Sequence, residues 1–190
     1  MIETPRTESP DELVGNSRNW GMLYEQYLIS KPTSDYFYWH GIYDEIEDAL
    51  FDMTNNHCSF CDIQPLRASG PTVEHFRPKK KFPLLAYYWS NLFYCCTNCQ
   101  KKGTKFSNKL LKPDQANYKF RYYFIYSYST GIIDPNPARS IEDQERAKIT
   151  IDWYGLNDWG RPDERIKERQ KFLEANNPNI NDYSYRFILH

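Results

Sequence analysis

The sequence has no run of apolar residues that approaches the roughly 20 needed to span a bilayer. Its first residues, Met-Ile-Glu-Thr-Pro-Arg-Thr-Glu, contain no apolar core and are not expected to act as a signal peptide. We therefore expect a cytoplasmic protein with no membrane partner. The chain also lacks internal repeats and low-complexity tracts. Its 190 residues fit one domain that can bury a core without disulfides.

Cysteine is scarce, but four of the five cysteines form two CxxC pairs, Cys58 with Cys61 and Cys96 with Cys99. Disulfides are rare in the cytosol, so paired motifs of this kind indicate a metal. Four thiolates favour a single tetrahedral Zn²⁺ in a closed structural site. Four buried reduced cysteines are one alternative, and a redox dithiol, which lacks a thioredoxin-like βαβ context here, is another. Cys95 is expected to be a small core residue.

Acidic residues are absent from a long basic segment, although the net charge of the chain is only −1. Residues 75–112 contain nine Lys and Arg and no Asp or Glu, which leaves 15 basic and 25 acidic residues elsewhere. This asymmetry indicates a local site for a polyanion such as nucleic acid, and a solvated surface is the alternative. The residues expected to contact nucleic acid are Arg77, Lys79, Lys80, Lys101, Lys102 and Lys105.

Hydrophobic periodicity predicts an α+β fold with a mobile leader at 1–17, one domain at 18–175 and an unassigned tail at 176–190. Helices are predicted over 18–30 and 36–54, the second capped by Thr33, Ser34 or Asp35. Strands at 72–76 and 91–95 and a helix from about 98 to 105 predict a ββα unit held by metal, within a core at 58–106.

Beyond the core, β-formers at 118–128, a turn at 129–131 and a return strand at 132–133 predict a hairpin. A helix is predicted over 141–154, with a Ser140 cap and a stop at Gly155. The last predicted helix is charged and covers 163–175.

His75 differs from the other three histidines because Glu74 precedes it and Arg77 follows it. Phosphodiester hydrolysis needs an activated water, a cation on the phosphate and stabilisation of the leaving oxygen. A neutral imidazole can deprotonate water, and a carboxylate can hold Mg²⁺. Neighbours in a regular strand face opposite sides, so Glu74 and His75 serve one site only at a strand end. Without the cysteines, a structural histidine would be the better interpretation.

The segment from Cys58 to Lys102 resembles the HNH endonucleases, whose pattern is CxxC, acidic-His, Asn-Leu, and CxxC followed by His or Asn. The matching residues are Cys58, Cys61, Glu74, His75, Asn91, Leu92, Cys96, Cys99, Gln100 and, as the downstream Lys of the pattern, Lys102. The resemblance implies a zinc-stapled ββα-metal (HNH, His-Me finger) core surrounded by helices, and hydrolysis with Mg²⁺ or Mn²⁺. It implies that His75 is the general base and that Asn91 braces the loop between the strands and orients that base. Glu74 and Gln100 would hold the catalytic cation, and Gln100 departs from the family pattern.

The resemblance is closest to the small nuclease subunits of Septu-type phage-defence systems (PtuB-like), including those attached to retrons. It rests on Glu-His-Phe-Arg-Pro-Lys at 74–79, Trp-Ser-Asn-Leu at 89–92 and the second CxxC with a nearby Lys. It spans about 43–173. It implies an antiviral effector nuclease with an ATPase partner (PtuA-like), a DNA or RNA substrate and, in retron versions, a reverse transcriptase with its DNA–RNA product. Gln100 favours the alternative, a zinc-stabilised module that binds nucleic acid or a partner with weak or no cleavage.

Overall fold

The protein has a mixed α+β architecture with two separate two-stranded antiparallel sheets. The structure, a computed structural model, describes residues 1–30, 38–64, 70 and 72–189. The helices and strands are α1 (Ser17–Ser30), α2 (Tyr38–Thr54), β1 (Thr72–His75), β2 (Leu92–Cys95), α3 (Thr97–Gln100), α4 (Phe120–Tyr123), β3 (Phe124–Tyr126), β4 (Ile133–Pro135), α5 (Ile141–Tyr154) and α6 (Arg161–Glu174). Short 3₁₀ turns cover Pro83–Leu85, Trp89–Asn91, Ile180–Asp182 and Arg186–Ile188.

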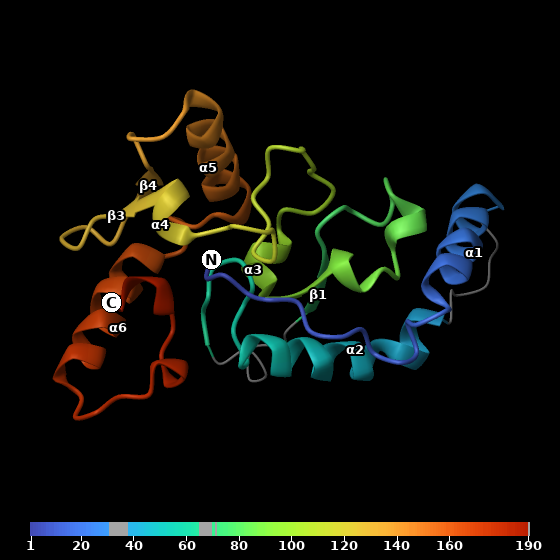
Figure 1. Ribbon diagram of the computed structural model, residues 1–190, viewed down its shortest axis with the longest axis horizontal. Coiled ribbons are helices and arrows are strands. Elements are labelled where there is room, and N and C mark those ends of the chain that lie inside the picture. The colour runs from blue at the N-terminus through green and yellow to red at the C-terminus, as the bar shows by residue number, and fades with distance from the viewer. Residues whose placement is uncertain (31–37, 65–69, 71, 190) are drawn as a thin grey trace.

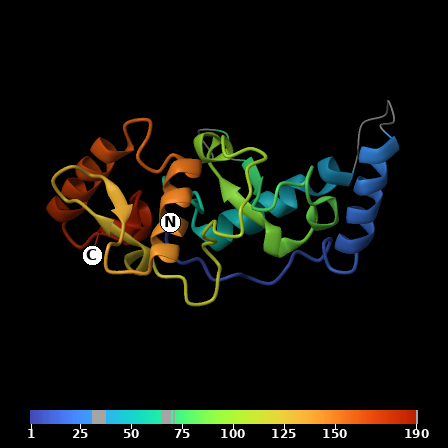
Figure 2. The ribbon, with the colours of Figure 1, turned by 90° about the horizontal axis from the view of Figure 1, so that it is seen from above.

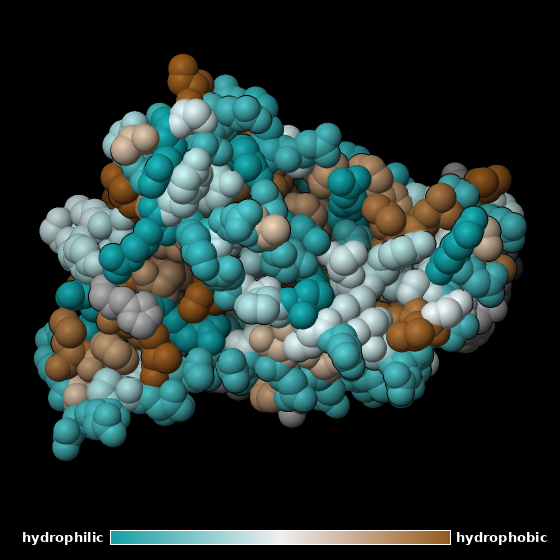
Figure 3. All heavy atoms as spheres, viewed as in Figure 1, coloured by the Kyte–Doolittle hydropathy of each residue, from teal (hydrophilic) through white to brown (hydrophobic). Residues whose placement is uncertain are grey.

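The molecule is elongated, with α1 at one end and the β3–β4 hairpin and α6 at the other (Figure 1). The strand β1, the helix α3 and most of α2 lie between them, and the view from above shows the same order along the long axis (Figure 2). The face in Figure 3 is mostly hydrophilic, with hydrophobic residues in small separate areas. Within the described residues, no helix is both long and apolar enough to cross a membrane.

The central unit consists of β1, β2 and α3 in the predicted order. The two strands pair from Thr72 with Cys95 to His75 with Leu92. Every residue of β2 is buried, which fits the continuous apolar run Leu-Phe-Tyr-Cys. The helix α3 ends at Gln100 rather than near 105, because the chain turns there and Gly103 adopts a positive φ of 57°.

The helices before this unit follow the periodicity of the sequence. Ile42, Ile46 and Leu50 form a buried stripe on α2, as their spacing predicts. The expected start of this helix at 36 and its cap at 33–35 lie outside the described residues. Gly21 lets α1 approach the loop after β1, because a Cβ there would lie 2.6 Å from the Leu84 carbonyl oxygen.

Residues 1–17, expected to form a mobile leader, pack along the central unit instead. Met1 and Leu13 are buried. The Thr4 amide donates to the Pro113 carbonyl at 3.1 Å. The Arg6 guanidinium donates to the carbonyls of Trp89 and Leu92 at 3.0 and 2.8 Å. This segment therefore supports the turn that leads into β2.

The unassigned tail also returns to the central unit. The Arg186 guanidinium forms a buried ion pair of 2.6 Å with Asp62, the residue after Cys61. The Tyr185 amide donates to the Asp62 carbonyl at 2.7 Å. The tail thus holds the loop that carries the first cysteine pair.

The segment 118–128 corrects the prediction of a continuous strand. Phe120–Tyr123 forms one helical turn and only Phe124–Tyr126 is a strand. Tertiary packing overrides the β propensity here, because the Phe120 ring stacks on Phe187 at 4.4 Å and Asn136 binds the Tyr122 carbonyl. The return strand is Ile133–Pro135. The helix α5 has the predicted bounds, with Ser140 as its cap and Gly155 at a φ of 55° as its stop, and α6 begins two residues earlier than predicted.

Candidate metal and catalytic centre

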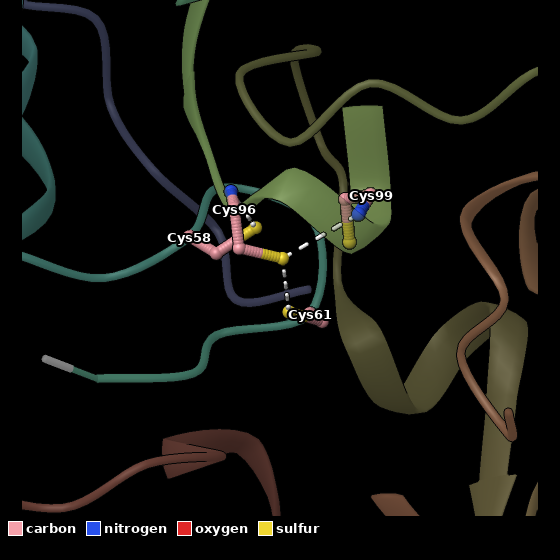
Figure 4. Close-up of side chains that lie close together, drawn as sticks. All are labelled: Cys58, Cys61, Cys96 and Cys99. Atoms are coloured by element: carbon pink, nitrogen blue, oxygen red, sulfur yellow. Dashed lines mark hydrogen bonds between the residues drawn. The ribbon is translucent and has the colours of Figure 1, made fainter. Parts of the chain in front are cut away.

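The four paired cysteines meet in one buried cluster. The ligand atoms of Cys58, Cys61, Cys96 and Cys99 all lie within 4.8 Å of one another. Figure 4 shows the sulfurs of the loop at 58–61 and those at the start of α3 converging on one point. Cys95 is buried next to this cluster but is not part of it, as predicted for a core residue. The cluster could hold one zinc ion.

The surroundings of the cluster suit negatively charged sulfur. The amides of Cys96 and Cys99 donate to the sulfurs of Cys58 and Cys96 at 3.5 and 3.4 Å. The buried Arg161 guanidinium donates to the sulfurs of Cys96 and Cys99 at 3.5 and 3.4 Å. Burial would lower the pKa of Arg161, but the neighbouring cysteine sulfurs outweigh burial and raise it. A donor set of four sulfurs with this support fits zinc in a closed structural site.

His75 lies at the end of β1 in a fixed orientation. Its Nε2 is 3.0 Å from the Ala86 carbonyl oxygen. A carbonyl can only accept, so Nε2 carries the proton and Nδ1 is left as the basic nitrogen. The Trp39 ring packs against the imidazole with 5.1 Å between centroids. Burial, with a smaller contribution from the Lys79 charge, lowers the pKa of His75 to about 3, so the ring is neutral at physiological pH.

Glu74 and His75 line the same cavity, which we call the His75 cavity, of about 390 Å³. His75 is the last residue of β1, so it lies at the strand end that the prediction requires, and Thr72 and Val73 of the same strand also line the cavity. Its other polar lining residues include Lys79, Lys80 and Gln100. Residues that carry a carboxylate, an imidazole, an amide and two ammonium groups therefore line one concave site.

Lys102 corrects a prediction, because it cannot contact nucleic acid. Its side chain is fully buried, and its ammonium lies 2.7 Å from Oε1 of Glu74 in an ion pair. The ammonium also donates to the carbonyls of His75 and Phe76 at 3.4 and 3.3 Å. Burial raises the pKa of Glu74 to about 7 even though Lys102 lowers it. Lys102 thus ties α3 and the residues after it to the end of β1.

Replacing Lys102 by methionine is expected to destabilise the protein by about 3 kcal/mol at pH 8, because the substitution leaves the Glu74 carboxylate buried without its partner. The loss should be smaller at pH 5, below the raised pKa of Glu74, where that group is protonated. Urea unfolding at fixed zinc concentration measures both values. The double variant Lys102→Met/Glu74→Gln should recover part of the stability. Equal losses at the two pH values would show that the ion pair is not the cause.

Asn91 joins the two ends of the loop between the strands. Its Oδ1 accepts from the Arg77 amide at 2.8 Å, and its Nδ2 donates to the carbonyls of Arg77 and Leu85 at 3.0 Å each. The next carbonyl after Leu85 is that of Ala86, which holds His75. The buried Asn91 side chain is therefore placed to fix the loop that orients the imidazole.

The remaining basic residues are distributed over several surfaces. Lys79 and Lys80 line the His75 cavity, with the Lys79 ammonium 5.0 Å from the centre of the Trp39 ring. Arg77 is exposed in a second cavity. Lys101 lies over the Trp159 ring at 4.7 Å, and Lys105 is exposed. Among these exposed or half-buried residues, Lys79 and Lys80 thus share the cavity of Glu74 and His75, whereas Arg77, Lys101 and Lys105 do not line it.

Two supporting groups were missed by the sequence analysis. The Ala86 carbonyl has no sequence signal, because any residue supplies a backbone oxygen. Arg161 belongs to a charged segment and lies far in sequence from both cysteine pairs, so its contact with sulfur depends on tertiary structure. Buried polar partners of this kind emerge only when the path of the chain is known.

Comparison with known proteins finds a relative that is similar to part of the chain. No family model matches the chain. The chain is 34% identical over 111 residues to a protein of Bacillus thuringiensis. That relative is the Septu protein PtuB. The match covers 57% of this chain and 40% of the relative, so the chain spans less than half of the length of PtuB. The similarity supports the resemblance to PtuB-like proteins.

Proposed function

We propose that the protein is a metal-dependent HNH endonuclease that hydrolyses phosphodiester bonds in nucleic acid. The observation that carries this proposal is that one cavity collects Glu74, His75 and Gln100, with the imidazole held through Nε2 by a backbone carbonyl. The ββα order and the four-cysteine cluster beneath it agree with the HNH pattern. The partial match to PtuB supports the same assignment.

His75 is the general base in this proposal. With its proton fixed on Nε2, its Nδ1 can accept a proton from a water molecule as that water attacks phosphorus. The bond from phosphorus to the leaving oxygen then breaks, and that oxygen is protonated from solvent. Asn91 is a positioning residue, because it fixes the loop whose carbonyl at Ala86 orients the base.

Oxygen donors in the His75 cavity suit a hard cation such as Mg²⁺ or Mn²⁺. Glu74 contributes a carboxylate and Gln100 contributes an amide carbonyl. Such an ion supplies charge stabilisation to the phosphate and the leaving oxygen. Lys79 and Lys80 in the cavity, with Arg77, Lys101 and Lys105 around it, would neutralise phosphates of the bound strand.

The similarity to PtuB also suggests the biological setting. We propose that the protein acts in a Septu-type antiphage defence complex in the cytoplasm, together with an ATPase subunit (PtuA-like). Retron-attached versions of this system would add a reverse transcriptase and its DNA–RNA product. An effector role is supported by the presence of Glu74, His75 and Gln100 in one cavity of a single chain.

A cleavage assay tests the proposal. The zinc-loaded protein is incubated with plasmid DNA, single-stranded DNA and RNA, with Mg²⁺ or Mn²⁺ or with neither. Cleavage of at least one substrate only when the added cation is present is the expected result. The assay is repeated with the co-purified ATPase partner, because activity can depend on the complex. Absence of cleavage under every condition would reject the nuclease assignment.

The ion pair between Lys102 and Glu74 favours the second candidate function, a zinc-stabilised module that binds nucleic acid or a partner without efficient cleavage. The carboxylate is already neutralised by an internal cation. Gln100 is a longer and more mobile ligand than the His or Asn of the family pattern. Binding of nucleic acid without cleavage in the same assay would identify this function.

A further inference from the structure

A second cavity lies on the other side of the turn that follows β1. It measures about 270 Å³ and is lined by Phe76, Arg77, Leu85, Tyr88, Ser90, Asn91 and Lys112. We call it the Arg77 pocket. His75 and Pro78 line the His75 cavity, whereas Phe76 and Arg77, the residues between them, line the Arg77 pocket. The two cavities are therefore separated by a single turn of the chain.

The charge of the Arg77 pocket is positive. Lys112 pairs with Asp114 at 3.2 Å, and Asp114 also pairs with Arg6 at 2.9 Å. One carboxylate is thus shared by two cations. Within the described residues, no carboxylate pairs with the Arg77 guanidinium, which lies over the Phe106 ring at 5.0 Å. Three cations and one anion leave two positive charges to be balanced.

The neutral polar groups of the pocket complete a set of donors. Ser90 and Tyr88 are exposed and contribute hydroxyl groups to its lining. The Asn91 amide is already committed to Arg77 and Leu85, so it shapes the pocket rather than binding in it. Burial lowers the pKa of Lys112. The Asp114 carboxylate opposes this shift, and the charges of Arg6 and Arg77 add to it. A bound anion would relieve that repulsion.

We infer that the Arg77 pocket binds a backbone phosphate of the same nucleic-acid strand that enters the His75 cavity. This inference rests on the proposed function. Two residues of extended chain span at most about 7 Å, which limits the separation of His75 and Arg77. A nucleic-acid strand carries one phosphate charge about every 3.4 Å along a duplex axis, so a phosphate one or two nucleotides from the scissile one can reach the pocket. The Lys112 ammonium and the hydroxyl groups of Tyr88 and Ser90 supply hydrogen bonds that a phosphodiester accepts. The Arg77 guanidinium, which lies over the Phe82 and Phe106 rings, adds positive charge near Lys112.

Binding measurements in a His75→Ala background test the inference without cleavage. The probes are a fluorescein-labelled single-stranded DNA oligonucleotide and an RNA of the same sequence, followed by fluorescence anisotropy. Ser90→Glu places a negative charge in the pocket and is expected to weaken binding of at least one probe about tenfold or more. Ser129→Glu makes the same change on an exposed turn of the distant hairpin and is expected to have little effect.

A second pair of variants removes a positive charge instead. Lys112→Gln is expected to reduce the slope of log Kd against log salt concentration by about 0.7, the value for one phosphate contact on a single strand. Lys148→Gln on the exposed face of α5 is the matched control and should leave the slope unchanged. Thermal unfolding of each variant checks that the fold is retained. If Lys112→Gln is destabilised, the binding measurement with Ser90→Glu decides the test instead.

The outcomes separate the subsite from the proposed function. Equal effects of the pocket and control variants, or no effect of either, would overturn the subsite while leaving the nuclease proposal in place. A parent protein that binds neither probe would overturn the subsite, and the cleavage assay with plasmid DNA and the partner would decide the nuclease proposal separately. Binding without cleavage in the wild-type assay rejects hydrolysis alone, and the slopes still decide the subsite. Calorimetric binding of ATP that Ser90→Glu abolishes, with unchanged oligonucleotide binding, would assign the pocket to a free nucleotide and overturn the inference.

Discussion

Replacing Cys58 by serine is expected to release the zinc ion and unfold the ββα unit. Four sulfurs lie within 4.8 Å of one another, so as thiolates they repel one another unless a cation lies between them. Arg161 and backbone amides offset part of that repulsion. Binding of structural zinc contributes about 10–16 kcal/mol to folding in small zinc domains. That is comparable to the total stability of about 5–15 kcal/mol typical of a protein domain, so its loss is sufficient to unfold the unit. Metal analysis and far-UV circular dichroism measure the two losses, and a strong chelator should reproduce them in the wild type.

Cys95→Ser is the matched control for this experiment. Cys95 is buried and adjacent in sequence to Cys96, but its sulfur lies outside the cluster. The control should retain one zinc per chain and lose only about 1–3 kcal/mol, because a buried hydroxyl is more costly than a thiol even where it can donate to the Cys96 carbonyl. Wild-type protein with far less than one zinc per chain, or a folded Cys58→Ser variant, would contradict the zinc assignment.

The features that could be predicted from the sequence are those set by local spacing. The two CxxC pairs predicted the cysteine cluster, because each pair places two thiolates close together regardless of the rest of the fold. The stripe of α2 and the cap and stop of α5 were equally local signals. The shared cavity of Glu74 and His75 was predicted only on a condition, the strand end, that the structure meets.

The features that could not be predicted depend on packing between distant segments. A count of basic residues cannot separate the buried Lys102 from its exposed neighbour Lys101, because burial of the ammonium requires a partner such as Glu74. The first residues are polar in composition, yet Arg6 finds carbonyl partners more than 80 positions away. The strand propensity of Phe120 is overridden by stacking on Phe187, a contact between residues far apart in sequence.

Replacing His75 by alanine is expected to reduce the cleavage rate about 10²–10⁴-fold, the usual contribution of a general base. His75→Gln should lose as much, because a glutamine amide can still donate to the Ala86 carbonyl but cannot accept a proton from water. Comparing the two variants therefore separates the loss of the base from loss of the contact with the loop. His40→Ala, which removes an exposed histidine elsewhere on α2, is the control.

The pH dependence of the wild type gives this prediction a second measurement. Burial lowers the pKa of His75 to about 3, far below the 6.5 of an exposed imidazole, so the base is already neutral at pH 5. The cleavage rate at saturating cation should not fall as the pH is lowered through 6.5. Between pH 6.5 and 3 the unfolded chain binds a proton on His75 that the folded protein does not bind. The free energy of unfolding therefore falls by about 1.4 kcal/mol for each unit by which the pH is lowered in this range. His75→Gln should remove that acid sensitivity of the unfolding free energy.

A rate that falls tenfold per unit below pH 6.5 in the wild type would show that the pKa of His75 is not lowered. A His75→Ala variant that cuts as fast as His40→Ala would show that this imidazole is not the base.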